Sequence, residues 1–509
     1  MLARAHTFTV EGLQTRHVTV EVDIRSGLPA FSIVGLADAG VREARERVQA
    51  AILNSGYEFP GRRITANLAP GDVPKAGPGL DLALACAVLA ASGQLPRERL
   101  ESHALFGELA LSGELRACQG TLAIAQATRE AGLKVLVLAS TSAREAMLVE
   151  GIGLATVTNL GAAVRVLRGG RADPLPRPVR EPNAKRLRAA GPDLSEVRGQ
   201  HHAVRALVIA AAGGHNSLMS GPPGTGKTML AQRLASILPE LNGPEAIEVT
   251  RIQSITGQSA GELASTRPFR APHHSITAAG LVGGSRRGWV GEVVLAHNGV
   301  LFLDELSEFA RPALEALRQP LEDGRVAIVR ARHSAVYPAR FMLIAATNPC
   351  PCGYAGTAER CRCSEADLAR HHRRLSGPLL DRIDLLTHLQ RDCAGELNAP
   401  PLTSSGKARE RVIAARERQA ARLRREGVTV NAQMDVRMLE QYVRLGERGQ
   451  EMMSLARRSG MLSARGQHRV LRVARTIADL NASEHVRARD LGAALALRPD
   501  AGLANSRVA

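Results

Sequence analysis

The sequence predicts an α/β protein built around a doubly wound parallel sheet, with a smaller α+β domain before the sheet and a helical lid after it. Residues 193–395 alternate strand-like apolar runs with helical patterns, which is typical of a parallel sheet covered by helices. Residues 221–228 form a glycine-rich loop of the kind that joins a strand to a helix in such sheets. Residues 300–303 are apolar throughout, as expected of a strand buried on both faces.

The chain is long enough for several domains, because 509 residues exceed what one hydrophobic core supports. We expect an N-terminal domain over residues 1–166, a proline- and arginine-rich linker over 167–192, the sheet domain over 193–395 and the helical domain over 396–509. The guiding patterns are strand-like at Val18–Ile24 and Ala104–Leu111, and helical at Val41–Asn54, Leu80–Ala91, Lys407–Arg425, Val436–Leu445 and Arg465–Leu480.

The glycine-rich loop indicates polyphosphate binding. It consists of Gly221, Pro222, Pro223, Gly224, Thr225, Gly226, Lys227 and Thr228. Its glycines let the backbone wrap around a phosphate chain, so that N–H groups and a helix N-terminus face the negative charge. Lys227 would add a mobile cation and Thr228 a hydroxyl ligand for Mg²⁺. The loop therefore predicts ATP and Mg²⁺ as cofactors.

An acidic pair follows the apolar run at 300–303. Asp304 stands where a parallel strand would deliver one carboxylate to the metal, and the adjacent Glu305 could orient or deprotonate the attacking water. Such acidic pairs are common after apolar strands, so the order of the two motifs carries the inference. Together they predict an ATPase.

The net charge of +17 lies entirely outside the N-terminal domain. Residues 1–165 hold 16 basic and 16 acidic side chains, which leaves 50 basic and 33 acidic ones for the rest. A basic field of this kind attracts polyanions and favours DNA as a partner, although an arginine-rich proteome is an alternative source. Aromatic residues make up only 3% of the chain, which argues for tracking of the phosphate backbone over base stacking.

The longest apolar runs, such as Leu82–Ala91, fall well short of a membrane span. The N-terminus lacks a charged segment followed by an apolar one. Four of the seven cysteines crowd into one short segment, a pattern of reducing compartments rather than of secreted disulfide frameworks. We therefore expect a cytoplasmic protein without a membrane partner.

Two further motifs resemble the AAA+ ATPases. Residues 343–347 read as another core strand that ends at Asn348, and Leu379-Leu380-Asp381-Arg382 follows. The resemblance implies that Asn348 is the sensor that holds water near the γ-phosphate, and that Arg382 reaches the nucleotide of a neighbouring subunit. An arginine in trans would stabilise the charge of the transition state and implies a homohexameric ring. The alternative for Arg382 is a local ion pair with Asp381 or Asp384.

The closer resemblance is to the ComM/YifB family of magnesium-chelatase-like AAA+ proteins. It is carried by residues 267–274 (Arg-Pro-Phe-Arg-Ala-Pro-His-His), 291–292, 295–298, 350–353 (Cys-Pro-Cys-Gly) and 463–472, and it covers essentially the whole chain. The resemblance implies a second sensor arginine in the helical domain. Arg465 fits this role best, and Arg472 stays open as the alternative.

The family resemblance also implies two insertions that face a central pore, around 271–291 and as a hairpin around 326–340. Within them Arg286, Arg287, Arg330, Arg332 and His333 would contact DNA. For each residue alone, a solvated surface charge is the alternative. His273 and His274 lack a matched metal partner and are expected to be structural.

The cysteine cluster reads Cys-x-Cys, eight intervening residues, then Cys-x-Cys. Cys350, Cys352, Cys361 and Cys363 could close a tetrahedral, structural Zn²⁺ site in a segment too short for its own core. The spacing within each pair is tighter than the usual two residues. Reduced, unliganded cysteines are the alternative.

The N-terminal domain resembles the Lon protease fold through residues 73–79 and 111–115. In Lon-type enzymes a serine stands where this chain has Gly79, and the partner lysine falls on Ile124 in a looser match. Without a hydroxyl nucleophile or an amine base, acyl transfer is excluded. We expect a proteolytically inactive domain, and Lys75 alone does not restore the chemistry.

The resemblance implies an ATP-driven hexameric DNA motor for branch migration in recombination, acting in the integration of incoming DNA during natural transformation. The alternative is a chelatase-like motor that remodels a protein partner. The Lon-like domain and the basic ATPase half argue against that alternative, and the missing serine argues against an ATP-dependent protease.

Overall fold

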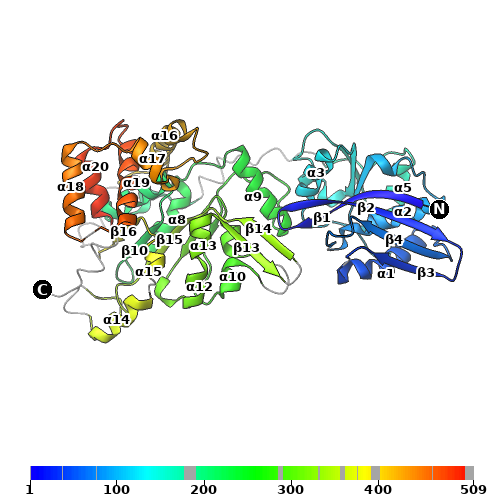
Figure 1. Ribbon diagram of the computed structural model, residues 1–509, viewed down its shortest axis with the longest axis horizontal. Helices are drawn as coiled ribbons and strands as arrows, with labels where there is room; N and C mark the ends of the chain where they lie inside the picture. Colours follow the sequence, from blue (N-terminus) through cyan, green and yellow to red (C-terminus); the bar gives the residue numbers. More distant parts are fainter. Residues whose placement is uncertain are drawn as a thin grey trace. The chain divides into compact units, whose positions relative to one another are not determined.

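The computed structural model describes residues 2–36, 38–75, 77–176, 191–284, 290–330, 333–355, 361–374, 377–390, 402–460 and 462–498. Within these ranges the side chains of residues 39, 329, 330, 333, 334, 372, 377 and 378 are not described. The chain forms two compact units, drawn with their elements in Figure 1. The first unit holds Met1–Arg180, Gly243–Ala264 and Val329–Tyr337, and the second holds Glu181–Asn242, Ser265–Ile328 and Pro338–Ala509.

The first unit is built on a seven-stranded mixed sheet in the order β3-β4-β2-β1-β5-β8-β9. Its long hairpin of β1 and β2 is antiparallel, whereas β5, β8 and β9 run parallel. Helix α2 packs against β1 and β2 and is buried along its whole length. The strands are β1 (Leu2–Glu11), β2 (Gln14–Arg25), β3 (Ala30–Val34), β4 (Arg63–Ala69), β5 (His103–Phe106), β8 (Val135–Ala139) and β9 (Gly153–Val157). The helices are α1 (Ala39–Asn54), α2 (Asp81–Ala91), α3 (Thr121–Glu130), α4 (Ala143–Ala146) and α5 (Leu160–Leu167).

Helix α9 (Gly243–Ile255) also belongs to the first unit, although it follows the phosphate-loop segment in sequence. Its residues contact α3, and Gly120 N donates to Ser254 O at 3.1 Å. Arg251 Nη2 donates to Leu13 O at 2.6 Å, and the Ser254 hydroxyl donates to the Glu145 carboxylate. The compact units are therefore not continuous stretches of sequence.

The second unit is built on a five-stranded sheet in the order β11-β12-β15-β10-β16, in which every neighbouring pair is parallel. This confirms the predicted parallel sheet. The chain leaves β10 for one side, adds β11, β12 and β15 there, and then crosses to the other side of β10 for β16. Ligands bind at the carboxyl ends of strands where the order reverses in this way. The strands are β10 (Ser217–Ser220), β11 (Phe269–Arg270), β12 (Val300–Leu303), β15 (Met342–Thr347) and β16 (Leu385–His388).

The helices that accompany this sheet are short, apart from α7, α8 and α14. The elements are α7 (His201–Gly213), α8 (Lys227–Ile237), α10 (Ala278–Val282), α11 (Glu292–Leu295), α12 (Arg311–Ala316), α13 (Arg318–Asp323), α14 (Glu365–Arg374) and α15 (Gly377–Leu380). The predicted hairpin before the sensor strand is present, because β13 (Arg325–Arg330) pairs with β14 (His333–Pro338) in a two-stranded sheet. Among the described residues, no helix is both long and apolar enough to cross a membrane.

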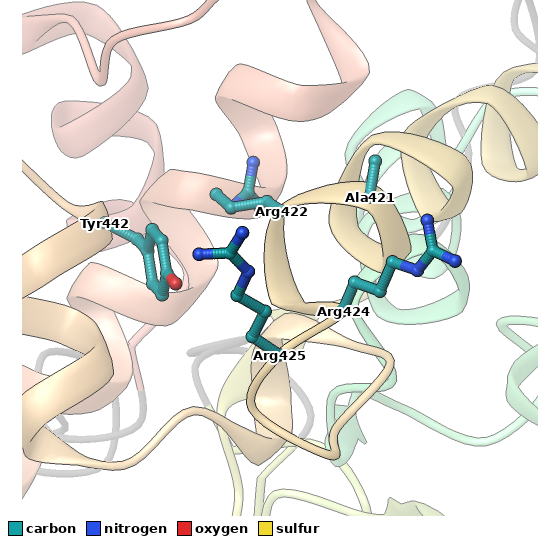
Figure 2. Close-up of a pocket in the computed structure, with 5 residues that line it drawn as sticks. All are labelled: Ala421, Arg422, Arg424, Arg425 and Tyr442. Atoms are coloured by element: carbon teal, nitrogen blue, oxygen red, sulfur yellow. The ribbon is translucent and has the colours of Figure 1, made fainter.

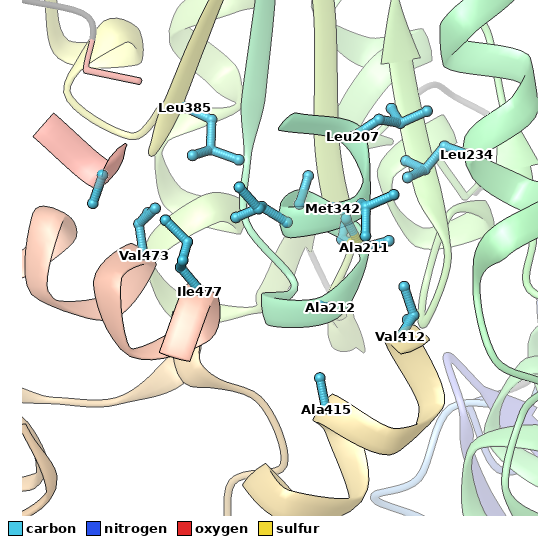
Figure 3. Close-up of a cluster of buried hydrophobic side chains, with 14 of the residues drawn as sticks. Leu207, Ala211, Ala212, Leu234, Met342, Leu385, Val412, Ala415, Val473 and Ile477 are labelled. Atoms are coloured by element: carbon cyan, nitrogen blue, oxygen red, sulfur yellow. The ribbon is translucent and has the colours of Figure 1, made fainter. Parts of the chain in front are cut away.

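The predicted helical segment packs onto the sheet through α16 and α19. Val412 and Ala415 of α16 and Val473 and Ile477 of α19 share one buried cluster with α7 and the sheet (Figure 3). Burial of such side chains contributes about 25 cal/mol for each Å² of apolar surface removed from water. The helices are α16 (Ser405–Leu423), α17 (Val436–Tyr442), α18 (Glu447–Arg458), α19 (Ala464–Leu480) and α20 (Ala488–Ala496).

A buried charge cluster ties the helical segment together. Asp479 accepts hydrogen bonds from Arg422 at 2.7 and 2.8 Å and from Arg475 at 2.9 and 3.2 Å. Asn431 Nδ2 adds a bond of 2.8 Å. Asp479 is 1% exposed and Arg475 is 2% exposed, so the two cations compensate a carboxylate that water does not reach.

Candidate nucleotide-binding site

The glycine-rich loop begins at the carboxyl end of β10 and leads into α8. Gly224 and Gly226 have φ angles of 81° and 82°, in the left-handed region that favours glycine. A Cβ on Gly221 would lie 2.6 Å from Leu389 O, so this position has no room for a side chain. The loop therefore has the tight backbone that a phosphate-binding turn requires, and the positive end of α8 follows it.

Lys227 lies at the first turn of α8, and its ammonium group lies over the loop. Nζ donates to Gly221 O at 2.7 Å, to Pro222 O at 2.9 Å and to Asn348 Oδ1 at 3.1 Å. Burial lowers the pKa of Lys227, and the negative charges of Asp304 and Glu305 offset part of this effect. The predicted phosphate cation and the predicted sensor side chain are thus brought into direct contact.

Thr228 and Asp304 are also brought together. The Thr228 hydroxyl donates to Asp304 Oδ2 at 2.6 Å, and Asp304 follows β12, the strand next to β15. A hydroxyl and a carboxylate are oxygen ligands of the kind that Mg²⁺ takes beside ATP phosphates. The side chains present therefore fit a magnesium ion at this edge of the sheet.

Glu305 has a φ angle of 52°, an uncommon conformation for a residue other than glycine. Its backbone N–H donates to Asp304 Oδ1 at 2.9 Å. Its carboxylate Oε2 lies 3.4 Å from His274 Nδ1, and the His274 ring packs against His273 with centroids 4.1 Å apart. This half-exposed carboxylate therefore contacts the loop that follows β11.

His274 is a site residue that the sequence reasoning assigned only a structural role. The signal that could have identified it is the strand order, because β11 is the neighbour of β12. Residues that follow adjacent parallel strands meet at one edge of the sheet. The sequence pattern alone does not reveal which strands are neighbours.

Asn348 lies at the end of β15, next to the phosphate-binding loop. Besides the bond between its side chain and Lys227, its backbone oxygen lies 2.9 Å from His371 Nε2. His371 belongs to α14 and is 4% exposed. Asn348 is thus held from two sides.

Arg382 lies after α15 and does not contact the loop residues of its own chain in the described structure. Its Nη2 donates to Glu322 of α13. Asn216 fixes the backbone nearby, because Asn216 Nδ2 donates to Arg382 O at 3.0 Å. Among the described contacts, Arg382 therefore has an ion-pair partner on α13, Glu322.

The two arginines considered as second sensor differ in environment. Arg465 is exposed in the first turn of α19, which Ser463 caps. Arg472 is largely enclosed, and its Nε donates to Met434 O at 2.8 Å. Burial lowers the pKa of Arg472, although the charges of Asp384 and Asp435 oppose this. Arg465 is thus the more exposed of the two.

Helix α19 contacts residues at the amino-terminal ends of β10 and β16, whereas the phosphate-binding loop lies at the carboxyl end of β10. Arg469 Nε is 3.7 Å from Asp384, which precedes β16, and Thr476 Oγ1 is 2.8 Å from His215 Nε2, which precedes β10. The loop, in contrast, follows the carboxyl end of β10. Arg465 is therefore not brought together with Lys227 within one chain.

The four cysteines of the sequence-predicted cluster meet in space. Their sulfur atoms all lie within 4.8 Å of one another, with separations of 3.3 Å for Cys350–Cys352, 3.9 Å for Cys350–Cys361 and 3.7 Å for Cys352–Cys361. A tetrahedral zinc with Zn–S bonds of about 2.3 Å requires sulfur atoms about 3.8 Å apart. The donor set and its spacing therefore fit a Cys₄ metal site.

Backbone groups favour the anionic form of one of these thiols. Hydrogen bonds from the backbone of Arg362 and Tyr354 lower the pKa of Cys352 to about 6. Burial instead raises the pKa of Cys350. Thiolates are the form that binds metal, so the lowered pKa favours coordination by Cys352.

The proposed DNA contacts fall largely outside the described structure. Arg286, Arg287 and Arg332 are not among the described residues. Arg330 ends β13 and His333 begins β14, but their side chains are not described. Their contact with DNA stays a prediction.

A basic pocket that the sequence did not suggest lies on the helical segment. A cavity of about 620 Å³ is lined by Ala421, Arg422, Arg424, Arg425 and Tyr442 (Figure 2). Arg422 is bound to Asp479, and Tyr442 donates to Glu426 Oε1 at 2.9 Å. Arg424 and Arg425 are exposed. The pocket thus offers two cations to an anionic group.

The two positions of the N-terminal unit that the sequence compared with Lon-type enzymes, Gly79 and Ile124, lie in crowded or buried surroundings. A Cβ on Gly79 would lie 2.4 Å from the Phe106 ring, so a serine at this position would displace that ring. Ile124 is fully buried in an apolar cluster with Phe8, Phe106 and Leu122. Lys75 is buried and donates to Pro70 O.

Comparison with known proteins relates three stretches of the chain to magnesium chelatase families. The family described as magnesium chelatase, subunit ChlI, matches residues 193–397. The description "subunit ChlI of Mg-chelatase" matches residues 20–142, and the ChlI C-terminal family matches residues 402–498.

Among individual relatives, the uncharacterized protein YifB of Escherichia coli strain K12 is 43% identical over 501 residues, which covers 98% of this chain and 97% of YifB. The competence protein ComM of Haemophilus influenzae is 41% identical over 502 residues, which covers 98% of this chain and 97% of ComM. The Holliday junction branch migration complex subunit RuvB of Acidothermus cellulolyticus is 38% identical over 136 residues, which covers 26% of this chain and 28% of RuvB.

Proposed function

The chain belongs to the ComM/YifB family of magnesium-chelatase-like AAA+ proteins, and from this premise we propose that it is an ATP-driven, hexameric DNA motor. The motor would drive branch migration in recombination and the integration of incoming DNA during natural transformation. The observation that carries the proposal is the assembled nucleotide site, in which Thr228 contacts Asp304 and Lys227 contacts Asn348, within a chain that matches ComM along its full length.

The proposed ATPase chemistry assigns a role to each side chain of the site. The loop backbone and Lys227 bind the phosphates, and Thr228 and Asp304 hold Mg²⁺, which neutralises charge on the phosphates when bound. Glu305 orients and deprotonates the attacking water. Asn348 holds that water near the γ-phosphate.

Two arginines would complete the site from a neighbouring subunit. Arg382 stabilises the transition state in trans, which requires it to leave Glu322. Helix α19 lies at the amino-terminal ends of the strands, so Arg465 does not approach Lys227 of its own chain. This favours action of Arg465 on the nucleotide of a neighbouring subunit as well. Both assignments depend on a ring, for which a homohexamer is our proposal.

DNA is the partner that the charge distribution favours. The whole excess of +17 lies after residue 165, and cations that track a phosphate backbone give affinity that falls with salt. Arg286, Arg287, Arg330, Arg332 and His333 are the proposed pore contacts. Arg424 and Arg425 add a basic pocket on the helical segment. Two relatives support the same partner, because ComM is a competence protein and RuvB is a subunit of the Holliday junction branch migration complex.

The N-terminal unit would be a Lon-like, proteolytically inactive domain that serves assembly or DNA binding in the cytoplasm. The crowding at Gly79 and the burial of Ile124 support inactivity. The four cysteines would hold a structural Zn²⁺, and the sulfur spacing supports this assignment.

The alternative is a chelatase-like motor that remodels a protein partner. The match of the chain to magnesium chelatase families favours this remodelling function. The two functions differ in their activator, because a DNA motor responds to a polyanion and a remodelling motor responds to its client protein.

The deciding experiment measures the ATPase rate of the full chain alone and with single-stranded, duplex and four-way-junction DNA, at about 50 mM and about 200 mM salt, a range over which phosphate contacts weaken by orders of magnitude. Stimulation that falls with salt is expected, with Glu305→Gln as the control that binds ATP without turnover. A basal rate that no DNA changes would reject the DNA motor and favour the remodelling function.

A further inference from the structure

The turn that carries the first two cysteines packs directly on the phosphate-binding loop. Gly353 N donates to Cys350 O at 2.9 Å, and Gly353 has a φ angle of 85°. A Cβ on Gly353 would lie 2.7 Å from Pro223 Cδ. Because protein interiors are close-packed, a side chain at this position would have to push the loop at Pro223. The cysteine turn and the phosphate-binding loop therefore constrain each other's position.

Both ends of the cysteine segment also reach Asn348. Asn348 precedes Cys350 by two residues, and α14 begins two residues after Cys363. His371 of α14 lies 2.9 Å from the Asn348 backbone oxygen and donates to it as the Nε2–H tautomer. Asn348 Oδ1 in turn accepts from Lys227 at 3.1 Å. The chain therefore leaves Asn348, passes through the cysteine segment and contacts Asn348 again through His371.

We propose that metal bound by the four cysteines regulates ATP turnover, because it fixes Asn348 and the phosphate-binding loop in their working positions. This inference rests on the proposed ATPase and zinc assignments. With the metal bound, four bonds join the two ends of a segment that is too short for its own core. Without it, His371 and Gly353 lose their common anchor, while the bonds of Lys227 to the loop carbonyls and of Thr228 to Asp304 remain.

The expected signature is a change in the catalytic rate with little change in nucleotide binding. Outer supports of a functional site typically change activity by about 10- to 100-fold when they are lost. We therefore expect the metal-free full chain to hydrolyse ATP at least about tenfold more slowly, while its affinity for a fluorescent ATP analogue changes by less than about threefold.

Metal content is the first measurement. Elemental analysis of the full chain should give one zinc per protomer, and a double Cys361→Ser, Cys363→Ser variant should give none. Cys118→Ser, in the N-terminal unit, is the matched control and should keep both zinc and turnover. Zinc removed by a chelator and then added back should restore the lost rate.

Two variants keep the four cysteines and disturb only the supports. His371→Ala should keep its zinc and yet lose turnover by a factor similar to that of zinc removal, and His371→Gln, which retains a donor, should recover part of it. Gly353→Ala should likewise keep zinc and lose rate. Removal of zinc from His371→Ala should reduce the rate little further, since both changes remove the same support of Asn348. Thermal melting checks that each variant is folded.

The outcomes separate this inference from the motor itself. A zinc-dependent basal rate without DNA stimulation would retain the inference and reject the DNA motor. Zinc that binds and leaves with no change in rate would overturn it, as would folded His371→Ala and Gly353→Ala variants with normal turnover. A full chain that binds no zinc would overturn it as well.

Discussion

Lys227 is the residue through which the parts of the nucleotide site meet. Its ammonium group bonds to two loop carbonyls and to Asn348. A phosphate chain offers the same group anionic oxygen atoms in place of these neutral acceptors. The site therefore depends on one cation that can exchange partners.

Replacement of Lys227 by Ala should abolish ATP hydrolysis. Loss of one electrostatic contact to the transition state costs about 10²- to 10³-fold in rate, and binding of nucleotide should weaken as well. Steady-state ATPase assays check this, with Lys407→Ala, an exposed lysine of α16, as the control. Turnover within a few-fold of the unmodified chain would contradict the site assignment.

Asp384 links the starts of β10 and β16 to the helical segment. Oδ2 accepts from Asn216 N at 3.1 Å, and Arg469 lies 3.7 Å from the carboxylate. Burial raises the pKa of Asp384, but the contact with His215 and the charges of Arg469 and Arg472 outweigh burial and hold the pKa below its usual 3.8. A depressed carboxyl pKa contributes stability above the unfolded pKa, and this stability is lost as the pH falls through the folded pKa.

Asp384→Asn should therefore destabilise the protein at pH 7 by about 1–3 kcal/mol. The difference from the unmodified chain should shrink as the pH falls below 3.8. Denaturant unfolding followed by circular dichroism at several pH values tests this. Asp381→Asn, its exposed neighbour, is the matched control. A difference that does not change with pH would contradict the assigned role of the charge.

The residue scale also shows where sequence reasoning succeeds. The meeting of the loop, Thr228 and Asp304 could be predicted because short motifs at strand ends imply a common sheet edge, and Asn348 was expected there from the AAA+ resemblance. The contact of His274 with Glu305 and the contact of Gly353 with Pro223 could not. They join segments that become neighbours only once the strand order is known.

Among the elements, the helical segment depends on a buried charge cluster. Asp479 receives two arginines and an asparagine from α16, α19 and the turn between α16 and α17. The periodicity of the sequence in this segment predicted the helices, but it did not predict that Arg475 would be buried. An apolar–polar pattern assigns arginine to the surface. Arg475 is buried because it pairs with the carboxylate of Asp479.

Asp479→Ala should destabilise the helical segment by about 3–5 kcal/mol, because it leaves buried arginine charge without compensation. Denaturant unfolding monitored at helical wavelengths measures the change. Glu315→Ala removes an exposed ion pair with Arg311 and should cost less than about 1 kcal/mol. Equal effects of the two substitutions would contradict the distinction between buried and exposed charge.

The hairpin of β13 and β14 is the element proposed to track DNA. Replacement of Arg330 and Arg332 together by Ala should reduce DNA stimulation and the salt dependence of DNA binding, while basal turnover stays unchanged. The exposed pair Arg62 and Arg63 in the N-terminal unit, replaced in the same way, is the control. Unchanged stimulation in the hairpin variant would move the DNA contacts to another element.

For the whole molecule, the central question is whether subunits complete one another's sites. Lys227→Ala and Arg382→Ala should each be inactive alone. Mixed before assembly, they should recover activity, since an intact loop on one subunit then faces an intact Arg382 on another. ATPase rates across mixing ratios, with sedimentation to measure assembly, test this. Mixtures that stay inactive despite assembly would contradict action in trans.

The whole-molecule fold was partly predictable. Alternating strands and helices identified the parallel sheet, and the glycine-rich loop fixed its functional edge. The place of α9 in the N-terminal unit was not predictable, because its sequence lies between the loop and β11 and carries only ordinary helical periodicity. Which unit a helix joins depends on complementary surfaces that no local pattern records.

The place of α9 limits where the chain can be divided into fragments that fold. The boundary between the units falls at five places along the chain, after residues 180, 242, 264, 328 and 337. Truncation at the proline-rich stretch would thus leave Ala246, Val249 and Ile252 of α9, buried in the intact protein, uncovered. The isolated N-terminal fragment would lack the same helix. Expressed fragments, and evolutionary exchanges of domains, should therefore keep α9 together with its N-terminal unit or replace both.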